Sequence, residues 1–225
     1  MATYRCFERL SIMKWIMSIL GLMMMACTEG RQNTEMESNT ETKEMKIAED
    51  RAVITLGGGC FWCTEAVFQR LKGVDTVISG YMGGTVKNPS YREICTGTTG
   101  HAEVIQVIYN PKMLTVTEIL EVFFATHDPT TLNRQGADVG TQYRSVVFYH
   151  NEEQRKTTEE IIQELNKAKI YNSPIVTQVA KADVFYPAED YHQNYYNLNS
   201  NQSYCAYVIT PKLEKFQKVF RDKLK

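Results

Sequence analysis

Two cysteines three residues apart are the groups in this chain best suited to chemistry. Cys60 and Cys63 lie in "GGGCFWCTE" (57–65), directly after three glycines. The pair could hold a metal, form a cross-link or attack a substrate. Zinc sites commonly combine two paired clusters of nitrogen or sulfur ligands, but this sequence has no second C-x-x-C and its four histidines are scattered. Thr64 follows Cys63, so the C-x-x-C-H haem motif is absent. We therefore expect no metal.

Cys60 has the local setting of a nucleophile. The apolar stretch "AVITLGG" (52–58) predicts a buried strand, and "FWCTEAVFQRLKG" (61–73) predicts a helix that ends at Gly73. Glycines permit a sharp turn and close approach of a substrate. A helix N-terminus favours the thiolate, which is the reactive form of cysteine. Cys63 would lie one turn further on, close enough to pair with Cys60. The alternative is two small buried residues at a strand-helix junction.

Strands and helices alternate along the part of the chain that must position these thiols. Further strands are predicted at 74–84, 102–111, 141–150 and 175–186, and further helices at 115–128, 151–169 and 211–225. Thr115 and Glu118 form a capping-box pattern, and Asn151 is a suitable N-cap. This order favours an α+β two-layer sandwich with a mixed β-sheet. Two long irregular segments, 83–101 and 127–143, are expected to be functional.

The N-terminal residues differ in composition from the rest. Residues 1–27 place Arg5, Arg9 and Lys14 before the uncharged run "WIMSILGLMMMAC", which is typical of a bacterial export signal. The run is shorter than the roughly 20 residues of a membrane-spanning helix. Its end resembles a lipobox, so Cys27 is expected to be lipidated. An ordinary cleaved signal and an uncleaved anchor are the alternatives.

Residues 28–50 form a polar stretch rich in Glu, Thr and Asn. Such a stretch cannot bury enough apolar surface to offset its ordering entropy, so we predict a flexible tether. Residues 51–225 then form one domain. The chain has 225 residues and a formal net charge of −1, which gives no indication of a nucleic-acid partner. We expect a monomer, exported and lipid-anchored in the bacterial cell envelope, either facing the periplasm or at the outer membrane.

A series of motifs beyond the cysteines resembles one known family. The blocks "GCFWCTE", "SGYMGG", "NPSYREICTGTTGHAEVIQVIYNP", "HDPTTLNRQGADVGTQYRSVVFYH", "FYPAEDYHQNYY" and "SYC" occur within residues 52–212, in the order found in A-type peptide-methionine sulfoxide reductases. The resemblance implies the ferredoxin-like plait of that family. It also implies reduction of the S epimer of methionine sulfoxide, free or in oxidised proteins, for their repair. No bound cofactor is implied, and a thioredoxin-like dithiol would be the reductant.

The resemblance also implies roles for individual residues. Cys60 matches the catalytic nucleophile, and Phe61 and Trp62 match the apolar pocket for the substrate methyl group. Glu103 matches the acid that protonates the sulfoxide oxygen. Because such an acid must hold its proton near neutral pH, we expect burial to raise the pKa of Glu103. Groups that hold or support the oxygen are implied at Tyr91, Tyr143 and Asp138. Taken singly, each of these residues also has a purely structural explanation.

The thiol that resolves the oxidised Cys60 is left open by the sequence. A sulfenic acid condenses with a second thiol to form a disulfide and water. Cys205 matches the C-terminal resolving position of the family and is favoured, although two flanking residues depart from the family pattern. Cys63 is the alternative, since many family members carry glycine there. Cys95 is expected to be structural.

Two other functions compete with the reductase hypothesis. One is a general C-x-x-C thiol-disulfide oxidoreductase of the cell envelope, although such sites usually place small residues or proline between the cysteines. The other is a non-catalytic envelope protein that binds methionine-rich or oxidised partners through an aromatic pocket.

Overall fold

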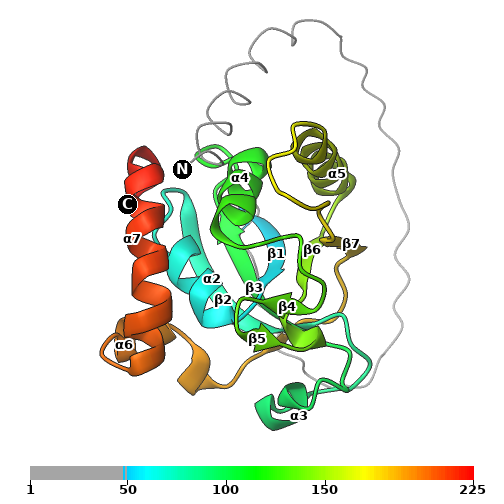
Figure 1. The fold of residues 1–225 in the computed structure, drawn as a ribbon, viewed down its shortest axis with the longest axis vertical. Coiled ribbons are helices and arrows are strands. Elements are labelled where there is room, and N and C mark those ends of the chain that lie inside the picture. The colour runs from blue at the N-terminus through cyan, green and yellow to red at the C-terminus, as the bar shows by residue number, and fades with distance from the viewer. Residues whose placement is uncertain (1–47, 49) are drawn as a thin grey trace, which may run out of the picture.

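The computed structural model describes residue 48 and residues 50–225, and its centre is a mixed six-stranded sheet (Figure 1). The strand order is β7-β6-β1-β3-β2-β8, and the neighbours are antiparallel except β6 and β7. The strands are β1 (Ala52–Gly58), β2 (Val74–Met82), β3 (Ala102–Tyr109), β6 (Ser145–Tyr149), β7 (Gln178–Lys181) and β8 (Tyr186–Pro187). A separate hairpin joins β4 (Arg134–Gln135) to β5 (Asp138–Val139). The predicted α+β fold with a mixed sheet is confirmed.

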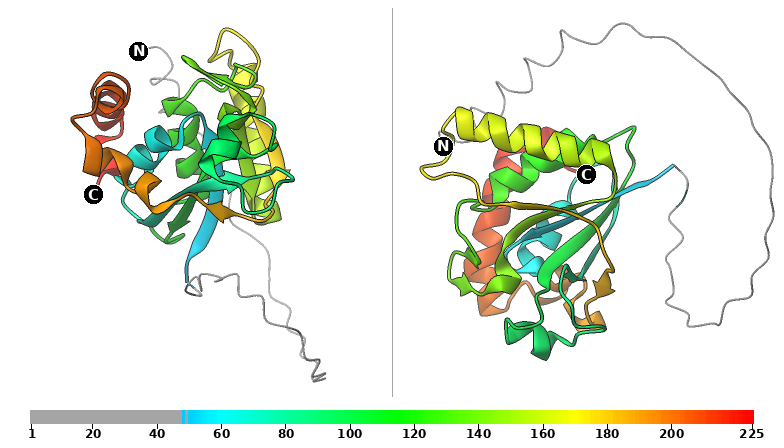
Figure 2. Two further views of the ribbon diagram at one scale, coloured as in Figure 1. Left: turned by 90° about the horizontal axis from the view of Figure 1, so that it is seen from below. Right: turned by 90° about the vertical axis from the view of Figure 1, so that its right-hand side faces the viewer.

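Helices cover one face of this sheet (Figures 1 and 2). They are α2 (Phe61–Phe68), α4 (Val116–Thr126), α5 (Glu152–Lys167) and α7 (Thr210–Val219); the short helix α6 (Tyr195–Asn199) packs against α2, and the short helix α3 (Tyr91–Cys95) lies below the sheet in Figure 1. The helix α2 packs between the sheet and α7, and α5 packs beside α4 near β6 and β7. A π-helix, Cys205–Ile209, leads into α7. Within the described residues, no helix has the length and apolar character needed to cross a membrane. The predicted signal, tether and lipidated Cys27 fall almost wholly outside these residues.

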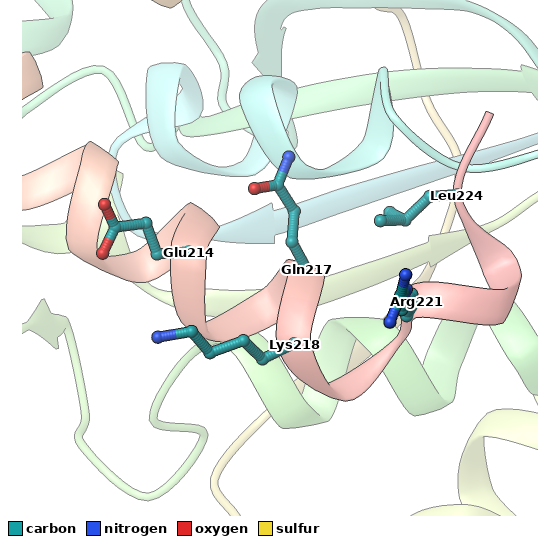
Figure 3. Close-up of a pocket in the computed structure, with 5 residues that line it drawn as sticks. All are labelled: Glu214, Gln217, Lys218, Arg221 and Leu224. Carbon is teal, nitrogen blue, oxygen red and sulfur yellow. The ribbon is translucent and has the colours of Figure 1, made fainter.

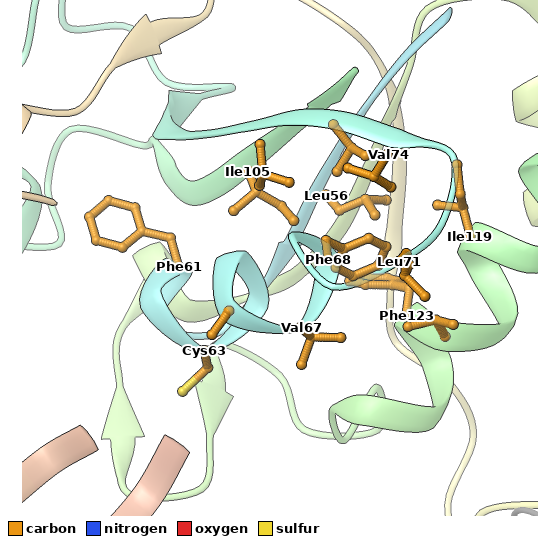
Figure 4. Packing of buried hydrophobic residues seen from close by; sticks show 14 of the residues in the cluster. Leu56, Phe61, Cys63, Val67, Phe68, Leu71, Val74, Ile105, Ile119 and Phe123 are labelled. Atoms are coloured by element: carbon orange, nitrogen blue, oxygen red, sulfur yellow. The ribbon is translucent and has the colours of Figure 1, made fainter. Parts of the chain in front are cut away.

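The main core lies between β1, β3 and the helices (Figure 4). Leu56 of β1 and Ile105 of β3 contribute to one cluster with Val67 and Phe68 of α2 and Phe123 of α4. All five are fully or almost fully buried. Burying a side chain of this kind stabilises a protein by about 1.5–3 kcal/mol. Because β1 and α2 share this core, the short link between them is held rigidly.

Local capping signals in the sequence are confirmed. The Thr115 hydroxyl accepts a hydrogen bond from the backbone N–H of Glu118 at 3.2 Å, and the Glu118 carboxylate accepts one from the backbone N–H of Thr115 at 2.9 Å. The predicted N-cap Asn151 accepts a hydrogen bond from the backbone N–H of Gln154 at 2.9 Å. Each of these two caps satisfies backbone N–H groups at the start of a helix that have no partner within the helix.

The predicted extension of the first helix to Gly73 is wrong, because α2 ends at Phe68. Beyond it, the backbone pairs with the last residues of the chain. Lys72 donates its N–H to the carbonyl of Lys223 at 2.8 Å, and Lys225 donates to the carbonyl of Arg70 at 2.9 Å. These long-range bonds replace the helical ones.

The predicted strand at 175–186 is divided between the two edges of the sheet. Residues Gln178–Lys181 pair with β6 at one edge, whereas Tyr186–Pro187 pairs with β2 at the other. The connection packs Ala182 and Phe185 against a second, smaller core cluster. The predicted strand at 141–150 is also shorter, because Thr141–Tyr143 forms a 3₁₀ turn before β6.

Candidate active site

Cys60 lies in the turn between the end of β1 and the start of α2. It is the N-cap residue of α2, and its side chain is 9% exposed. Gly59 before it has a φ of +91°, and a Cβ at that position would lie 2.5 Å from Cγ of Gln135. A glycine is therefore needed both for the turn and for the close approach of the β4–β5 hairpin. The turn aims the sulfur at the start of the helix.

Glu103 reaches the same helix start from the neighbouring strand β3. Its Oε2 accepts a hydrogen bond from the backbone N–H of Phe61 at 3.1 Å. That N–H is one of the helix-start donors that have no partner within the helix. The side chain is 1% exposed, and burial raises the pKa of Glu103 to about 8, with the Phe61 hydrogen bond opposing the shift. The predicted rise in the pKa of this carboxyl is confirmed.

A buried acid of this kind makes the stability of the protein depend on pH. Between its ordinary pKa of 4.5 and its folded pKa of about 8, the folded protein keeps a proton that the unfolded chain releases. The free energy of unfolding therefore falls as pH rises through this window. Glutamine has no proton to lose and keeps an acceptor for Phe61. Above pH 8, Glu103→Gln should be more stable than the wild type by at least roughly 1 kcal/mol.

Urea unfolding of both proteins at about pH 4 and about pH 9 measures this difference. The gain in the free energy of unfolding should shrink at the lower pH, where both states of the wild type hold the proton. A gain of equal size at both pH values would show that packing, rather than the buried charge, separates the two proteins.

Cys63 forms a thiol pair with Cys60. The interaction of the two thiols, burial and the nearby Glu103 raise the pKa of Cys60, whereas the interaction with Cys60 lowers the pKa of Cys63 to about 6. The two thiols therefore lose their protons as a pair rather than independently. The Cys60 thiolate expected at the helix N-terminus stays a prediction.

Trp62 and Phe61 belong to a cluster of aromatic rings beside the thiols. The Trp62 ring stacks on Tyr195, with ring centroids 3.7 Å apart and planes 6° from parallel. Tyr204 meets it edge-on at 5.9 Å. The ring of Phe61 lies 6.2 Å from that of Trp62, and His192 accepts a hydrogen bond from the indole N–H at 3.2 Å. Such a wall suits an apolar group that offers no hydrogen bonds.

The other three predicted residues come from the two irregular segments. Tyr91 begins α3 and Tyr143 ends the 3₁₀ turn before β6. Burial, followed by the charge of Glu103, raises the pKa of both hydroxyls. Asp138 of β5 accepts a hydrogen bond from the Tyr204 hydroxyl at 3.1 Å. The structure thus brings all three residues to the surroundings of Glu103 and the thiol pair.

Several residues at the site were not singled out from the sequence. Buried Glu65 of α2 accepts backbone hydrogen bonds from Asn194 at 2.8 Å and from Tyr195 at 3.1 Å. It thereby fixes the loop that places Tyr195 on Trp62. The hydroxyl of Tyr204 lies 3.8 Å from Sγ of Cys63. The dense run of aromatic residues in "EDYHQNYY" was the only local signal.

Neither of the remaining thiols is bonded to another. Cys205, at the start of the π-helix, is fully buried, whereas Cys95, at the end of α3, is exposed. The Cys205 backbone directly follows Tyr204, so the two residues must move together.

No group of three or more potential metal ligands gathers anywhere in the described part of the chain. An open hollow does lie along α7, away from the thiols (Figure 3). It is lined by Glu214, Gln217, Lys218, Arg221 and Leu224. None of the thiol, acid or aromatic residues of the site contributes to it.

The family model of peptide methionine sulfoxide reductase matches residues 52–224. The chain belongs to this family. The reductase is 55% identical to the MsrA of Polynucleobacter asymbioticus over 167 residues, which is 74% of this chain and 88% of the relative. It is 57% identical to the MsrA of Saccharolobus solfataricus over 173 residues, which is 77% of this chain and 97% of the relative.

Solved structures agree with this assignment. The reduced form of Saccharomyces cerevisiae Mxr1 matches the reductase with a TM-score of 0.65 and 37% identity, over 72% of this chain and 94% of that one. Methionine sulfoxide reductase A of Corynebacterium diphtheriae matches with a TM-score of 0.60 and 35% identity, over 68% of this chain and 76% of that one. The chain is therefore a methionine sulfoxide reductase that works through cysteine chemistry, as its motifs predicted.

Proposed function

We propose that this reductase removes the oxygen from the S epimer of methionine sulfoxide, with Cys60 as nucleophile and Glu103 as acid. One observation carries the proposal: Glu103 is bonded to the first N–H of the helix that Cys60 caps. With a pKa of about 8, this carboxyl holds a proton at neutral pH. A thiol and a protonated acid are thus held at one helix start, which is what sulfoxide reduction requires.

The reaction begins with the thiol pair. Cys63, whose pKa is the lower of the two, takes the proton of Cys60, and the resulting Cys60 thiolate attacks the sulfoxide sulfur and forms an S–S bond. Glu103 gives its proton to the oxygen. The S–S bond formed by this attack and the substrate S–O bond then break, and the oxygen ends as the hydroxyl of a sulfenic acid on Cys60. The substrate sulfur gains two electrons, Cys60 loses two, and methionine leaves.

Tyr91 and Tyr143 support this step because their raised pKa values keep both hydroxyls protonated. A phenol O–H can donate a hydrogen bond to the sulfoxide oxygen, where negative charge grows as the S–O bond weakens. Asp138 acts one step removed, through its hydrogen bond to Tyr204. The pocket of Phe61 and Trp62 receives the substrate methyl group.

An epimer-resolved assay tests the activity. Incubated with dithiothreitol and a peptide that carries racemic methionine sulfoxide, the enzyme should consume the S epimer and leave the R epimer. Chromatography of the two epimers measures the result. Consumption of neither epimer, or of the R epimer alone, would overturn the proposal. Insulin reduction in a parallel sample tests the rival function, a general disulfide oxidoreductase.

Contact in the resting site favours Cys63 for the first disulfide. Its thiol interacts with that of Cys60, whereas Cys205 is buried in the π-helix. Cys205, which the family resemblance favours, would then take over the link by thiol-disulfide exchange after the π-helix moves. A thioredoxin-like dithiol reduces the final disulfide. In this order, Cys63 forms the first disulfide with Cys60, and Cys205 belongs to the final disulfide that the reductant reduces.

Disulfide mapping after one turnover without reductant tests this order. At early times, mass spectrometry should find mostly a Cys60–Cys63 link, and a link that contains Cys205 should grow later. In Cys63→Ser, only the Cys60–Cys205 link should form. Cys95→Ser is the matched control and should leave the pattern unchanged. A Cys60–Cys205 link that appears first in the wild type, with Cys63 free, would refute the order.

We also propose that the chain is exported, lipid-anchored through Cys27 and monomeric. The basic residues, apolar run and lipobox-like end of residues 1–27 support the export and the lipid anchor. The mass of the native N-terminal peptide should show diacylglycerol on Cys27, and Cys27→Ser should lose it. A native protein that begins at unmodified Met1 would contradict the anchor, and sedimentation of the purified protein tests the monomer.

A further inference from the structure

His192 lies within the aromatic cluster around Trp62, and the reaction steps do not use it. It ends the short turn Asp190–His192 and is 1% exposed. Its ring centroid lies 4.3 Å from that of Tyr91, 5.1 Å from that of Phe61 and 5.5 Å from that of Trp62. A residue that contacts three of these rings can set their arrangement.

The hydrogen-bond pattern fixes the protonation of this imidazole. The indole N–H of Trp62 can only donate, so Nδ1 of His192, 3.2 Å away, must be the acceptor. The proton of the neutral ring is then on Nε2. This atom is buried and has no hydrogen-bond partner among the described residues, and Oε2 of Glu189 lies 3.9 Å away. That separation is too long for a hydrogen bond but orients the Nε2–H dipole toward a carboxylate.

Packing alone does not account for a histidine here. An unpartnered buried N–H costs free energy, and a phenylalanine ring would fill the same space without that cost. The advantage of histidine lies at its other nitrogen, Nδ1, which accepts the hydrogen bond from the indole N–H of Trp62. Tyr195 supports one face of the same indole and Tyr204 meets it edge-on. The two tyrosines therefore fix the tilt of the Trp62 ring. His192 prevents this ring from rotating in its own plane.

We propose that His192 is a positioning residue: its Nδ1 holds the Trp62 indole so that the pocket accepts an S-methyl group and disfavours larger S-alkyl groups. The inference rests on the proposed function, because Trp62 is taken to receive the substrate methyl. It assigns His192 to substrate selection rather than to the proton and electron transfers at Cys60.

Two substitutions separate the hydrogen bond from the shape of the ring. His192→Phe keeps a ring but has no acceptor. His192→Asn loses the ring but keeps an oxygen in the place of Nδ1. The matched control is His127→Phe, which replaces a half-buried histidine whose ring bonds the Phe123 carbonyl and the Ser145 hydroxyl instead. All are made in the full chain with Trp15→Phe, which leaves Trp62 as the sole tryptophan.

The first readout is the indole N–H resonance of Trp62 in a ¹⁵N-correlated NMR spectrum. In His192→Phe this resonance should move upfield and its hydrogen exchange should quicken, because the acceptor is lost. In His192→Asn and His127→Phe it should stay close to that of the parent protein. An unchanged resonance in His192→Phe would overturn the hydrogen bond.

The second readout is the ratio of kcat/KM for methionine sulfoxide to that for ethionine sulfoxide, which carries an S-ethyl group. His192→Phe should lower this ratio about fivefold, mainly through KM, and His192→Asn should restore most of it. A ratio in His192→Asn as low as that in His192→Phe, or an equal fall in His127→Phe, would overturn the proposal. If the parent protein reduces neither sulfoxide, the proposed function fails. The NMR comparison still tests whether His192 holds the Trp62 indole.

Discussion

Replacing Cys60 with serine should slow the reduction of methionine sulfoxide by at least about 10⁴-fold. A serine hydroxyl ionises far less readily than a thiol and has no sulfenic acid to form. Serine is a good N-cap residue of similar size, so α2 should begin at the same place. Methionine formed in a single turnover, measured beside circular dichroism, reports activity and fold together.

The matched control is Cys95→Ser, because this thiol is exposed and lies at the end of α3. Its activity should stay within about twofold of the wild type. Substantial single-turnover activity in Cys60→Ser would move the nucleophile to another thiol, and Cys63, with its pKa lowered to about 6, would be the next to replace.

Glu103→Gln should slow the first chemical step by about 10²–10³-fold, because glutamine keeps the hydrogen bond to Phe61 but cannot give a proton. The pH dependence gives a sharper test. An acid with a pKa of about 8 is protonated below that pH and ionised above it. The wild-type single-turnover rate should therefore fall as pH rises past about 8, and this fall should disappear in the variant.

The control for this second prediction is Glu65→Gln. Glu65 is also buried and also has its pKa raised by burial, but it bonds the backbone of Asn194 and Tyr195. Its variant should keep the fall in rate above pH 8. If Glu103→Gln keeps the same fall, the pH dependence belongs to the thiol pair rather than to the acid.

Elements with local signals could be predicted from the sequence. The strand β1 is observed where the apolar run predicts it, and α4 begins at the capping box of Thr115. The end of α2 could not be predicted in this way. Residues 70–72 bond to the chain some 150 positions further on, and no pattern around Gly73 reveals that competition.

The residues of the site also fall into those that the sequence predicted and those that it did not. Cys60, Glu103 and the two tyrosines were predicted because their motifs resemble a family. The segment after β8 had no periodicity, and distant bonds set its shape: Gln193 accepts a hydrogen bond from the backbone N–H of Ser79 at 2.9 Å, and Glu65 binds the next two backbone N–H groups. His192 and Tyr204 therefore became visible only in the folded structure.

The π-helix at Cys205–Ile209 determines how Tyr204 and Cys205 are rotated relative to the C-terminal helix α7. An α-helix turns by about 100° for each residue, and a π-helical turn accommodates about one residue more than an α-helical turn. Leu213 and Phe216 anchor α7 in the core. Deleting a single residue such as Ala206 would let the segment relax into a regular helix while α7 stayed in place. Tyr204 would then swing by about 100°, away from Cys63 and Asp138, and Cys205 would leave its buried position. The length of this five-residue segment is thus as much a determinant of the redox chemistry as the identity of its cysteine.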